Sequence, residues 1–285
     1  MTMPGGDLTD EDFEKFRSLI YRVSGIQIAT NKKLMITNRL RRRVRETKLP
    51  GFAEYYAFLT SPAGGREMPL FLDEITTNET YFYRDPPHYE WFAGTFLPEI
   101  ARQAHARKRP RRLRIWSAAC STGEELYSLS IKIMAARGLF PNWPIQLLGT
   151  DLSGSALEEA RAGTYDERAV RLVGAAERSA YFTHDAQSQR WTVRPEVRAM
   201  ASWKRHNLLF PLREEPFDCI FLKNVLIYFD VESKKAVLKN LLPLLARGGF
   251  LVAGPTEGIY KMLDPLDQLK SWLFQRPEDP RSGGG

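Results

Sequence analysis

Cysteine is scarce in this 285-residue sequence, which contains only Cys120 and Cys219. Two cysteines so far apart indicate neither a disulfide framework nor a zinc site. The four histidines are scattered and lack the i, i+4 spacing of a helical metal site. We therefore expect a reduced protein without a metal.

Long hydrophobic runs are missing as well. No apolar stretch approaches the roughly eighteen residues that a membrane span needs, and the acidic segment 1–16 lacks the apolar centre of a signal peptide. We therefore expect a cytoplasmic protein that does not insert into the membrane. The net charge of +7 favours an acidic partner, which on charge alone could be nucleic acid, an anionic surface or a protein.

The first sixty residues are typical of helices. Phe13, Phe16 and Ile20 recur at spacings of three and four residues, which predicts a buried helical stripe. Thr9 precedes an acidic first turn, as an N-cap does, and Gly25 ends the pattern. This segment predicts an amphipathic first helix.

Two further helices are expected, over about 31–48 and 52–59. On the first of these, Arg39, Arg42 and Arg45 lie three residues apart and share one face. A basic face of this kind suits an acidic helical surface of a partner, although such a face is often only solvated.

Beyond residue 110 short apolar runs alternate with helical patterns. The predicted strands are 113–119, 145–150, 217–222 and 250–253, and the predicted helices are 125–137, 155–162 and 233–245. This alternation is typical of a parallel sheet covered by helices on both faces. The fold class is therefore α/β, with a doubly wound, Rossmann-like sheet.

One stretch, at about 164–205, does not follow this rhythm. Its alternating pieces, at 191–194 and 201–204, predict a helix with a small antiparallel β insertion. We therefore divide the chain into a helical domain, a linker with a connecting helix, the α/β domain that carries the insertion, and a tail expected to be disordered. Their bounds are 1–75, 76–110, 111–275 and 276–285.

The strongest motif lies at 115–125, where the first strand is expected to meet a helix. Its small residues and Gly123 let backbone N–H groups approach a ligand beside the helix N-terminus. It is neither the G-x-G-x-x-G fingerprint nor a phosphate loop. Glu124 and Glu125 disfavour a phosphate and favour a cationic or amino-bearing ligand such as S-adenosylmethionine. A helix N-terminus with matching acids is the alternative.

Further polar residues are expected at strand tips. Asp151 ends the second run, where an acid can accept hydrogen bonds from ribose hydroxyls or can cap the next helix. Asn207-Leu208 and Asn224 are also placed at strand ends. Because ligands bind at the carboxyl ends of parallel strands, these positions together favour a ligand site.

Three motifs, spaced along the chain, resemble those of the CheR chemoreceptor glutamate methyltransferases. They are Trp116-Ser-Ala-Ala-Cys-Ser-Thr-Gly-Glu-Glu, Thr76-Thr-Asn-Glu-Thr-Tyr-Phe-Tyr-Arg-Asp and Lys223-Asn-Val-Leu-Ile-Tyr-Phe-Asp. The resemblance extends to about residue 258. It implies a small helical domain followed by a methyltransferase domain with an inserted β-subdomain. One departure is Lys223, which stands where the family commonly has arginine.

The resemblance also implies roles for individual residues. The implied contacts to S-adenosylmethionine are Asn78, Thr80, Arg84, Glu124, Glu125, Asp151, Asn207, Leu208, Lys223 and Asn224. Tyr228 and Arg102 are implied to act on the reacting carboxylate, and Arg39, Arg42 and Arg45 to meet the protein substrate. The implied reaction is methyl transfer to glutamate carboxylates on the cytoplasmic domain of chemoreceptors, by a protein we expect to be a monomer.

Two other functions remain open at this stage. A nucleic-acid methyltransferase would suit the basic charge, but 224–228 lacks the proline and aromatic neighbours of an Asn-Pro-Pro-Tyr clamp. A signalling adaptor that binds S-adenosylmethionine without turnover is the third reading. We expect no nucleic-acid partner.

Overall fold

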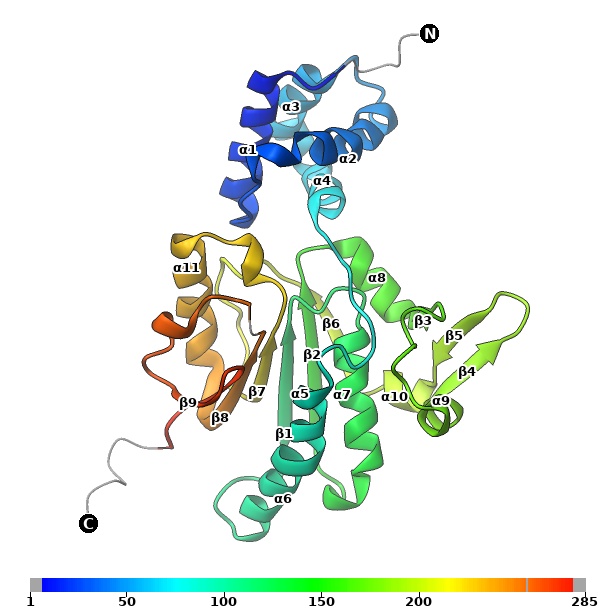
Figure 1. Ribbon diagram of the computed structural model, residues 1–285, viewed down its shortest axis with the longest axis vertical. Helices are drawn as coiled ribbons and strands as arrows, with labels where there is room; N and C mark the ends of the chain where they lie inside the picture. The colour runs from blue at the N-terminus through cyan, green and yellow to red at the C-terminus, as the bar shows by residue number, and fades with distance from the viewer. Residues whose placement is uncertain (1–6, 255, 279–285) are drawn as a thin grey trace.

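The structure is a computed structural model that describes residues 7–254 and 256–278. A helical domain stands over one end of a larger α/β domain, and a small sheet projects from the side of the latter (Figure 1). Within the described ranges no helix is both long and apolar enough to cross a membrane.

The N-terminal domain is built from four helices. They are α1 (Asp10–Ser24), α2 (Lys33–Glu46), α3 (Phe52–Thr60) and α4 (Met68–Ile75), with 3₁₀ turns at Thr30–Lys32 and Pro62–Arg66. Thr9 caps α1 by accepting a hydrogen bond from the Asp12 N–H, and Gly25 ends it with a φ of 74°. Phe13, Phe16 and Ile20 are buried, so the predicted stripe is confirmed.

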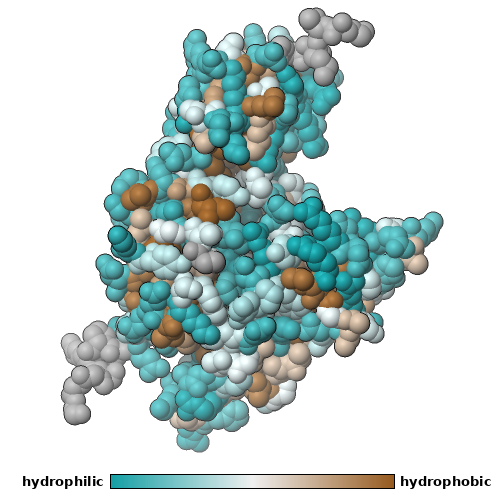
Figure 2. Space-filling view, viewed as in Figure 1, coloured by the Kyte–Doolittle hydropathy of each residue, from teal (hydrophilic) through white to brown (hydrophobic). Residues whose placement is uncertain are grey.

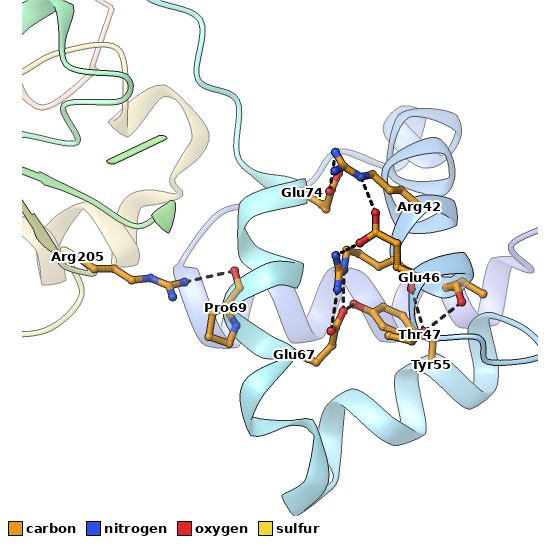
Figure 3. A network of polar contacts seen from close by, with 10 residues as sticks. Arg42, Glu46, Thr47, Tyr55, Glu67, Pro69, Glu74 and Arg205 are labelled. Atoms are coloured by element: carbon orange, nitrogen blue, oxygen red, sulfur yellow. Dashed lines mark hydrogen bonds and ion pairs between the residues drawn. The ribbon is translucent and has the colours of Figure 1, made fainter. Parts of the chain in front are cut away.

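A buried ion pair joins α2 to the start of α4. Arg43 donates to both Glu67 oxygens, at 2.8 and 2.9 Å. The Tyr55 hydroxyl donates to Glu67 Oε1 at 2.9 Å (Figure 3). A buried charge needs such complete pairing to be tolerated. This network fixes α4, from which the chain leaves for the second domain.

The α/β domain contains a seven-stranded sheet in the order β6-β2-β1-β7-β8-β10-β9. The strands are β1 (Leu113–Ala118), β2 (Ile145–Asp151), β6 (Ala201–Arg205), β7 (Phe217–Leu222), β8 (Leu245–Ala253), β9 (Asp267–Lys270) and β10 (Leu273–Gln275). The first five strands of that order run parallel, and β10 is antiparallel to both of its neighbours. The predicted Rossmann-like class is confirmed.

Helices cover both faces of the sheet. They are α5 (Pro86–Trp91), a π-helical turn (Phe92–Phe96), α6 (Leu97–His105), α7 (Glu124–Ala135), α8 (Gly154–Ala162) and α11 (Val231–Leu241). Consecutive β1 residues enter different cores: Ile115 packs with α5, α6 and α7, and Trp116 with α11. Burial on both sides explains why the central strands are continuous apolar runs.

The inserted subdomain is a three-stranded antiparallel sheet in the order β3-β5-β4, with two short helices. Its elements are β3 (Thr164–Tyr165), α9 (Ala175–Tyr181), β4 (Phe182–Asp185), β5 (Arg190–Val193) and α10 (Pro195–Arg198). The prediction that the insertion extends to residue 205 was wrong, because Ala201–Arg205 pairs in parallel with β2. Because β6 is a half-exposed edge strand, its polar and apolar residues alternate, as they do in a strand of a small antiparallel sheet.

The C-terminal segment also differs from its prediction. β9 and β10 were not expected, and every residue of β9 is exposed, so no apolar alternation marks it. The disordered tail was expected from residue 276, yet the Arg276 N–H donates to Gly249 O at 2.9 Å. The rest of that predicted tail, 279–285, lies outside the described residues.

Candidate active site

A cavity of about 500 Å³ lies between the helical domain and the carboxyl ends of β1, β2, β6 and β7. Its walls come mainly from residues 26–29, 75–80, 119–121, 206–208, 223–225 and 227–229. The volume is in the range of small-molecule sites. Both domains therefore build the site, and the linker between them forms one wall.

The loop after β1 makes a tight turn against the cavity. Ala119, Ser121 and Gly123 all have positive φ values. A Cβ at Gly123 would lie 2.8 Å from Ala160 Cβ and from the Trp203 ring, at a φ of 95°. Only glycine fits this position. The predicted small-residue turn at the start of α7 is confirmed.

Asp151 joins the tips of β1 and β2. Its two carboxylate oxygens accept hydrogen bonds from the backbone N–H groups of Ser121 and Ser153, each at 2.8 Å. The side chain is buried but lines the cavity, and this burial raises its pKa above the usual range. The alternative role as a helix cap was wrong, because Ser153 caps α8 by accepting from the Ala156 N–H.

Glu125 and Lys223 form the charged floor of the cavity. Lys223 Nζ lies 3.2 Å from Glu125 Oε2 and 3.3 Å from Asp85 Oδ2, and donates to Arg84 O at 2.9 Å. Ser117 Oγ donates to Glu125 Oε1 at 2.8 Å. The lysine side chain is 2% exposed, so it is fully committed to this network. It ties β7 to α7 and to the interdomain segment.

Glu124 points away from the cavity. Successive helical residues lie about 100° apart around the axis, so of the two neighbouring acids only Glu125 lines the site. Glu124 accepts a hydrogen bond from Thr122 Oγ1 at 2.7 Å, and burial raises its pKa to about 7. The open choice between the two glutamates thus favours Glu125 as the residue facing a ligand.

This burial predicts a pH-dependent stability. A raised pKa in the folded state means that unfolding releases a proton between about pH 4.5 and 7, so stability is highest below this window and falls as the pH rises through it. Glu124→Gln removes this proton exchange. The unfolding free energy of the variant minus that of the wild type should therefore be more favourable at pH 8 than at pH 5, by on the order of 2 kcal/mol. Urea unfolding at both pH values measures this gap. Parallel changes in the two proteins would contradict it, and exposed Glu158→Gln is the matched control.

The interdomain linker contributes Asn78, Thr80 and Arg84 to the cavity. Ser121 Oγ donates to Asn78 O at 2.9 Å, which holds the linker against the loop after β1. Arg84 Nη1 donates to Glu79 O at 2.9 Å. The guanidinium is half-buried, and no carboxylate among the described residues pairs with it, so it can receive an anionic group of a ligand.

Residues after β6 and β7 line the opposite wall. The Asn207 amide is engaged: it donates to Val23 O of α1 at 2.8 Å and accepts from the Leu209 N–H at 3.1 Å. Leu208 is buried against the cavity. Asn224 has a left-handed φ of 58°, and its side-chain amide has no partner within the described part of the chain.

Glu257 was missed by the sequence analysis. It is fully buried and accepts hydrogen bonds from the backbone N–H groups of Asn224 and Leu226, the latter at 2.6 Å. Burial raises its pKa to about 7. No spacing reveals this role, because the glutamate lies in the loop after β8 and reaches the neighbouring strand tip only in the folded sheet.

The end of α1 and the residues after it contact the loop that carries Tyr228. Ile26 forms an antiparallel bridge with Phe229, the Gln27 N–H donates to Tyr228 O at 2.8 Å, and the Tyr21 hydroxyl donates to Asp230 Oδ2 at 2.8 Å. Tyr228 itself is 39% exposed and lines the cavity. Hydrophobic surface gathers where α11 begins, below the helical domain (Figure 2). We call this exposed edge of the cavity, at Tyr228, its mouth.

Arg102 is not part of the site, and its expected catalytic role was wrong. It lies on α6, which leads to the amino end of β1 and so lies far from the carboxyl ends of the strands (Figure 1). Its side chain is 64% exposed and pairs with Glu99 at 2.6 Å. The position of Arg102 along the chain, shortly after the linker motif, does not reveal that α6 runs away from the cavity.

The three arginines of α2 do not line the cavity either. Arg42 pairs with Glu46 at 3.0 Å and Glu74 at 3.4 Å, and remains 63% exposed (Figure 3). Arg45 is exposed, whereas Arg39 turns toward the linker. These arginines thus face three different surroundings, although their spacing placed them on one face.

The cavity suits S-adenosylmethionine chemically. Its floor offers the Glu125 carboxylate to a cationic group, its far end offers Asp151 to hydroxyls, and the Arg84 guanidinium is available to a carboxylate. These three groups suit a ligand that has an amino group, a carboxylate and ribose hydroxyls, as an amino acid joined to a nucleoside does.

Comparisons with known proteins give a consistent result. Residues 11–76 match the family described as CheR methyltransferase, all-alpha domain, and residues 78–273 match CheR methyltransferase, SAM binding domain. A chemotaxis protein methyltransferase of Klebsiella aerogenes is 35% identical over 254 residues, covering 88% of this chain and 84% of the relative. Chemotaxis protein methyltransferase 1 of Pseudomonas aeruginosa is 35% identical over 265 residues, covering 91% and 94%. Among solved structures, the N-methyltransferase NodS of Bradyrhizobium japonicum is similar at 17% identity and a TM-score of 0.35, covering 58% of this chain and 79% of that one.

Proposed function

This chain belongs to the CheR methyltransferase family, and from that premise we propose that it methylates glutamate side chains of chemoreceptors with S-adenosylmethionine. The observation that carries the proposal is the cavity itself. It combines a buried acid at a strand tip, a charged floor and a mouth with an exposed tyrosine, and both domains enclose it. The substrate carboxylate would enter through that mouth.

The residues that would hold the cofactor follow from the site. Arg84 would pair with its carboxylate, Glu125 with its amino group and Asp151 with its ribose hydroxyls. Leu208 and the backbone at Asn207 would face the adenine, because the Asn207 amide is engaged with α1. Asn78, Thr80 and Asn224 would complete the contacts, with Lys223 holding Glu125 in place.

The chemistry requires little beyond alignment. When bound, S-adenosylmethionine supplies an electrophilic methyl group on a sulfonium. A free glutamate has a pKa of about 4.3 and is an anion near pH 7, so no base is needed to activate it. The task of the protein is to orient the carboxylate, and Tyr228, an exposed residue at the mouth, carries a hydroxyl suited to that.

The protein substrate would meet the helical domain. The net charge of +7 and the exposed Arg42 and Arg45 on α2 suit an acidic helical surface. We propose that a monomer acts in this way on the cytoplasmic domain of the receptor.

The direct test is incubation with S-adenosylmethionine labelled in its methyl group and a receptor cytoplasmic fragment. We expect base-labile label on receptor glutamates, and a fragment with those glutamates changed to alanine serves as the control. Label that enters RNA or DNA instead would favour the nucleic-acid alternative. Binding of the cofactor without transfer to any receptor would favour the adaptor.

Tyr228→Phe isolates the role of the hydroxyl. It should lower kcat by roughly 10-fold to 100-fold, the scale of one positioned hydrogen bond, and leave the affinity for S-adenosylhomocysteine within twofold. Single-turnover methyl transfer and calorimetry measure the two quantities. Phe229, on the same loop but bridged to Ile26, should not be used as a control, whereas exposed Tyr260→Phe is suitable. A normal kcat for Tyr228→Phe would refute an orienting hydroxyl.

A further inference from the structure

The side chain of Arg39 contacts the linker between the domains. Its Nη1 donates to Ile75 O at 2.6 Å and to Thr76 O at 3.3 Å, and its Nη2 donates to Thr77 Oγ1 at 3.1 Å. Ile75 is the last residue of α4, and Thr76 is its cap, already in an extended conformation. Carbonyl groups at a helix end lack partners within the helix and carry partial negative charge. A guanidinium is well suited to hold them.

The segment that Arg39 holds is a wall of the cavity. Residues 76–80 all line it, and they belong to no helix or strand. Without a backbone ladder, their position depends on side-chain contacts. Arg39 fixes the start of the segment, and Ser121 fixes its middle by donating to Asn78 O at 2.9 Å.

Neighbouring arginines on α2 show that this contact is specific to Arg39. Arg41 pairs with the exposed Asp7, and Arg42 pairs with Glu46 and Glu74 (Figure 3). Neither donates to the linker. Of the three arginines on the basic face, Arg39 is therefore the one that contacts the linker, whereas Arg42 pairs with Glu46 and Glu74 and Arg45 is exposed.

We infer that Arg39 is a positioning residue for the cofactor, which orders the linker wall of the cavity from the helical domain. It acts through residues 76–80 and does not itself line the site. This inference rests on the proposed assignment of the cavity to S-adenosylmethionine. It differs from a role in contacting the protein substrate, because its effect exists in the absence of any receptor.

The test measures S-adenosylhomocysteine binding by calorimetry without receptor. Arg39→Ala should weaken the affinity about 10-fold, as expected for loss of charge-assisted hydrogen bonds, and Arg39→Lys, which keeps the charge but not the fork, about threefold. Arg41→Ala, on the same helix, should leave the affinity unchanged, since an exposed pair contributes little. In steady-state assays Arg39→Lys should raise the KM for S-adenosylmethionine and leave the KM for the receptor unaltered.

Hydrogen–deuterium exchange supplies a readout that needs no ligand. In Arg39→Lys the amide of Thr76, which donates to Leu72 O at 3.2 Å, should exchange faster than in the wild type. The amides of α1 and α3 should stay protected, which separates a loosened linker from an unfolded domain. Unchanged exchange and affinity in the Arg39 variants, with a raised receptor KM, would overturn the inference. Failure of the wild type to bind S-adenosylhomocysteine would overturn the proposed function as well.

Discussion

Replacing Asp151 with alanine should weaken the binding of S-adenosylhomocysteine by about 100-fold or more. A hydrogen bond to a charged group contributes about 1.5–3 kcal/mol, and two ribose hydroxyls would lose such a partner, where 1.4 kcal/mol is a tenfold change. In the variant the backbone N–H groups of Ser121 and Ser153 also lose the carboxylate to which they donate in the wild type. The loop after β1 would then lose its anchor to β2.

Asp151→Asn separates these two effects. It keeps the size of the side chain and one acceptor oxygen, so it should retain more of the fold and lose an intermediate 10-fold to 30-fold in affinity. Asp185→Asn is a matched control, because Asp185 accepts from the Gln187 N–H at 2.9 Å in a remote hairpin. Calorimetry below the unfolding temperature of each variant measures the affinity. An unchanged dissociation constant for Asp151→Ala would remove the ribose assignment.

Replacing Lys223 with methionine should cost about 2–4 kcal/mol of unfolding free energy, because two carboxylates lose their shared cation. The side chain of Glu125 is 13% exposed and that of Asp85 is 34% exposed, which keeps the cost below that of a fully buried pair. Lys223 also donates to Arg84 O, so the variant should lower cofactor affinity as well. Urea unfolding and calorimetry measure the two losses.

Lys223→Arg tests whether charge alone is needed. Arginine keeps the positive charge and has several N–H donors for the two carboxylates, so the variant should stay within about 1 kcal/mol of the wild type, the usual range for a conservative core change. Lys235→Met is the surface control: its pair with Glu232 is well exposed and should contribute less than 1 kcal/mol. If Lys223→Met unfolded at the same urea concentration as Lys235→Met, the charged floor would have no structural role.

The sequence was sufficient for the fold class and for the parts of the cavity wall at the strand tips and in the linker, but not for the part that residues 24–35 of the helical domain contribute. Apolar runs predict central strands because those strands are buried on both faces, as in β1 and β7. Edge strands carry a weaker pattern. β6 was therefore assigned to the insertion and the fully exposed β9 was not predicted. Local patterns record burial, and they do not record which sheet a strand joins.

The candidate site could be predicted where a residue type meets a strand tip, as at Asp151 and Asn224. The candidate site could not be predicted where a contact joins residues that are far apart in the sequence. Glu257 reaches Asn224 from the next strand over, and Arg39 reaches the linker from another helix. Arg102 failed for the opposite reason: its chemistry was plausible, but α6 carries it to the other end of the sheet. The direction in which a helix carries a side chain is set by how the helix packs in the fold. The spacing of residues along the chain does not show this packing.

The bridge between Ile26 and Phe229 has a consequence for protein engineering. The end of α1 and the loop that carries Tyr228 contact one another through this bridge, so we expect a helical domain from a relative to fit this loop poorly. A chimera that takes its first 76 residues from a relative should work only if the loop at 224–230 is transplanted with them. Swapping receptor preference by exchanging the helical part alone would disturb the geometry of methyl transfer at the same time.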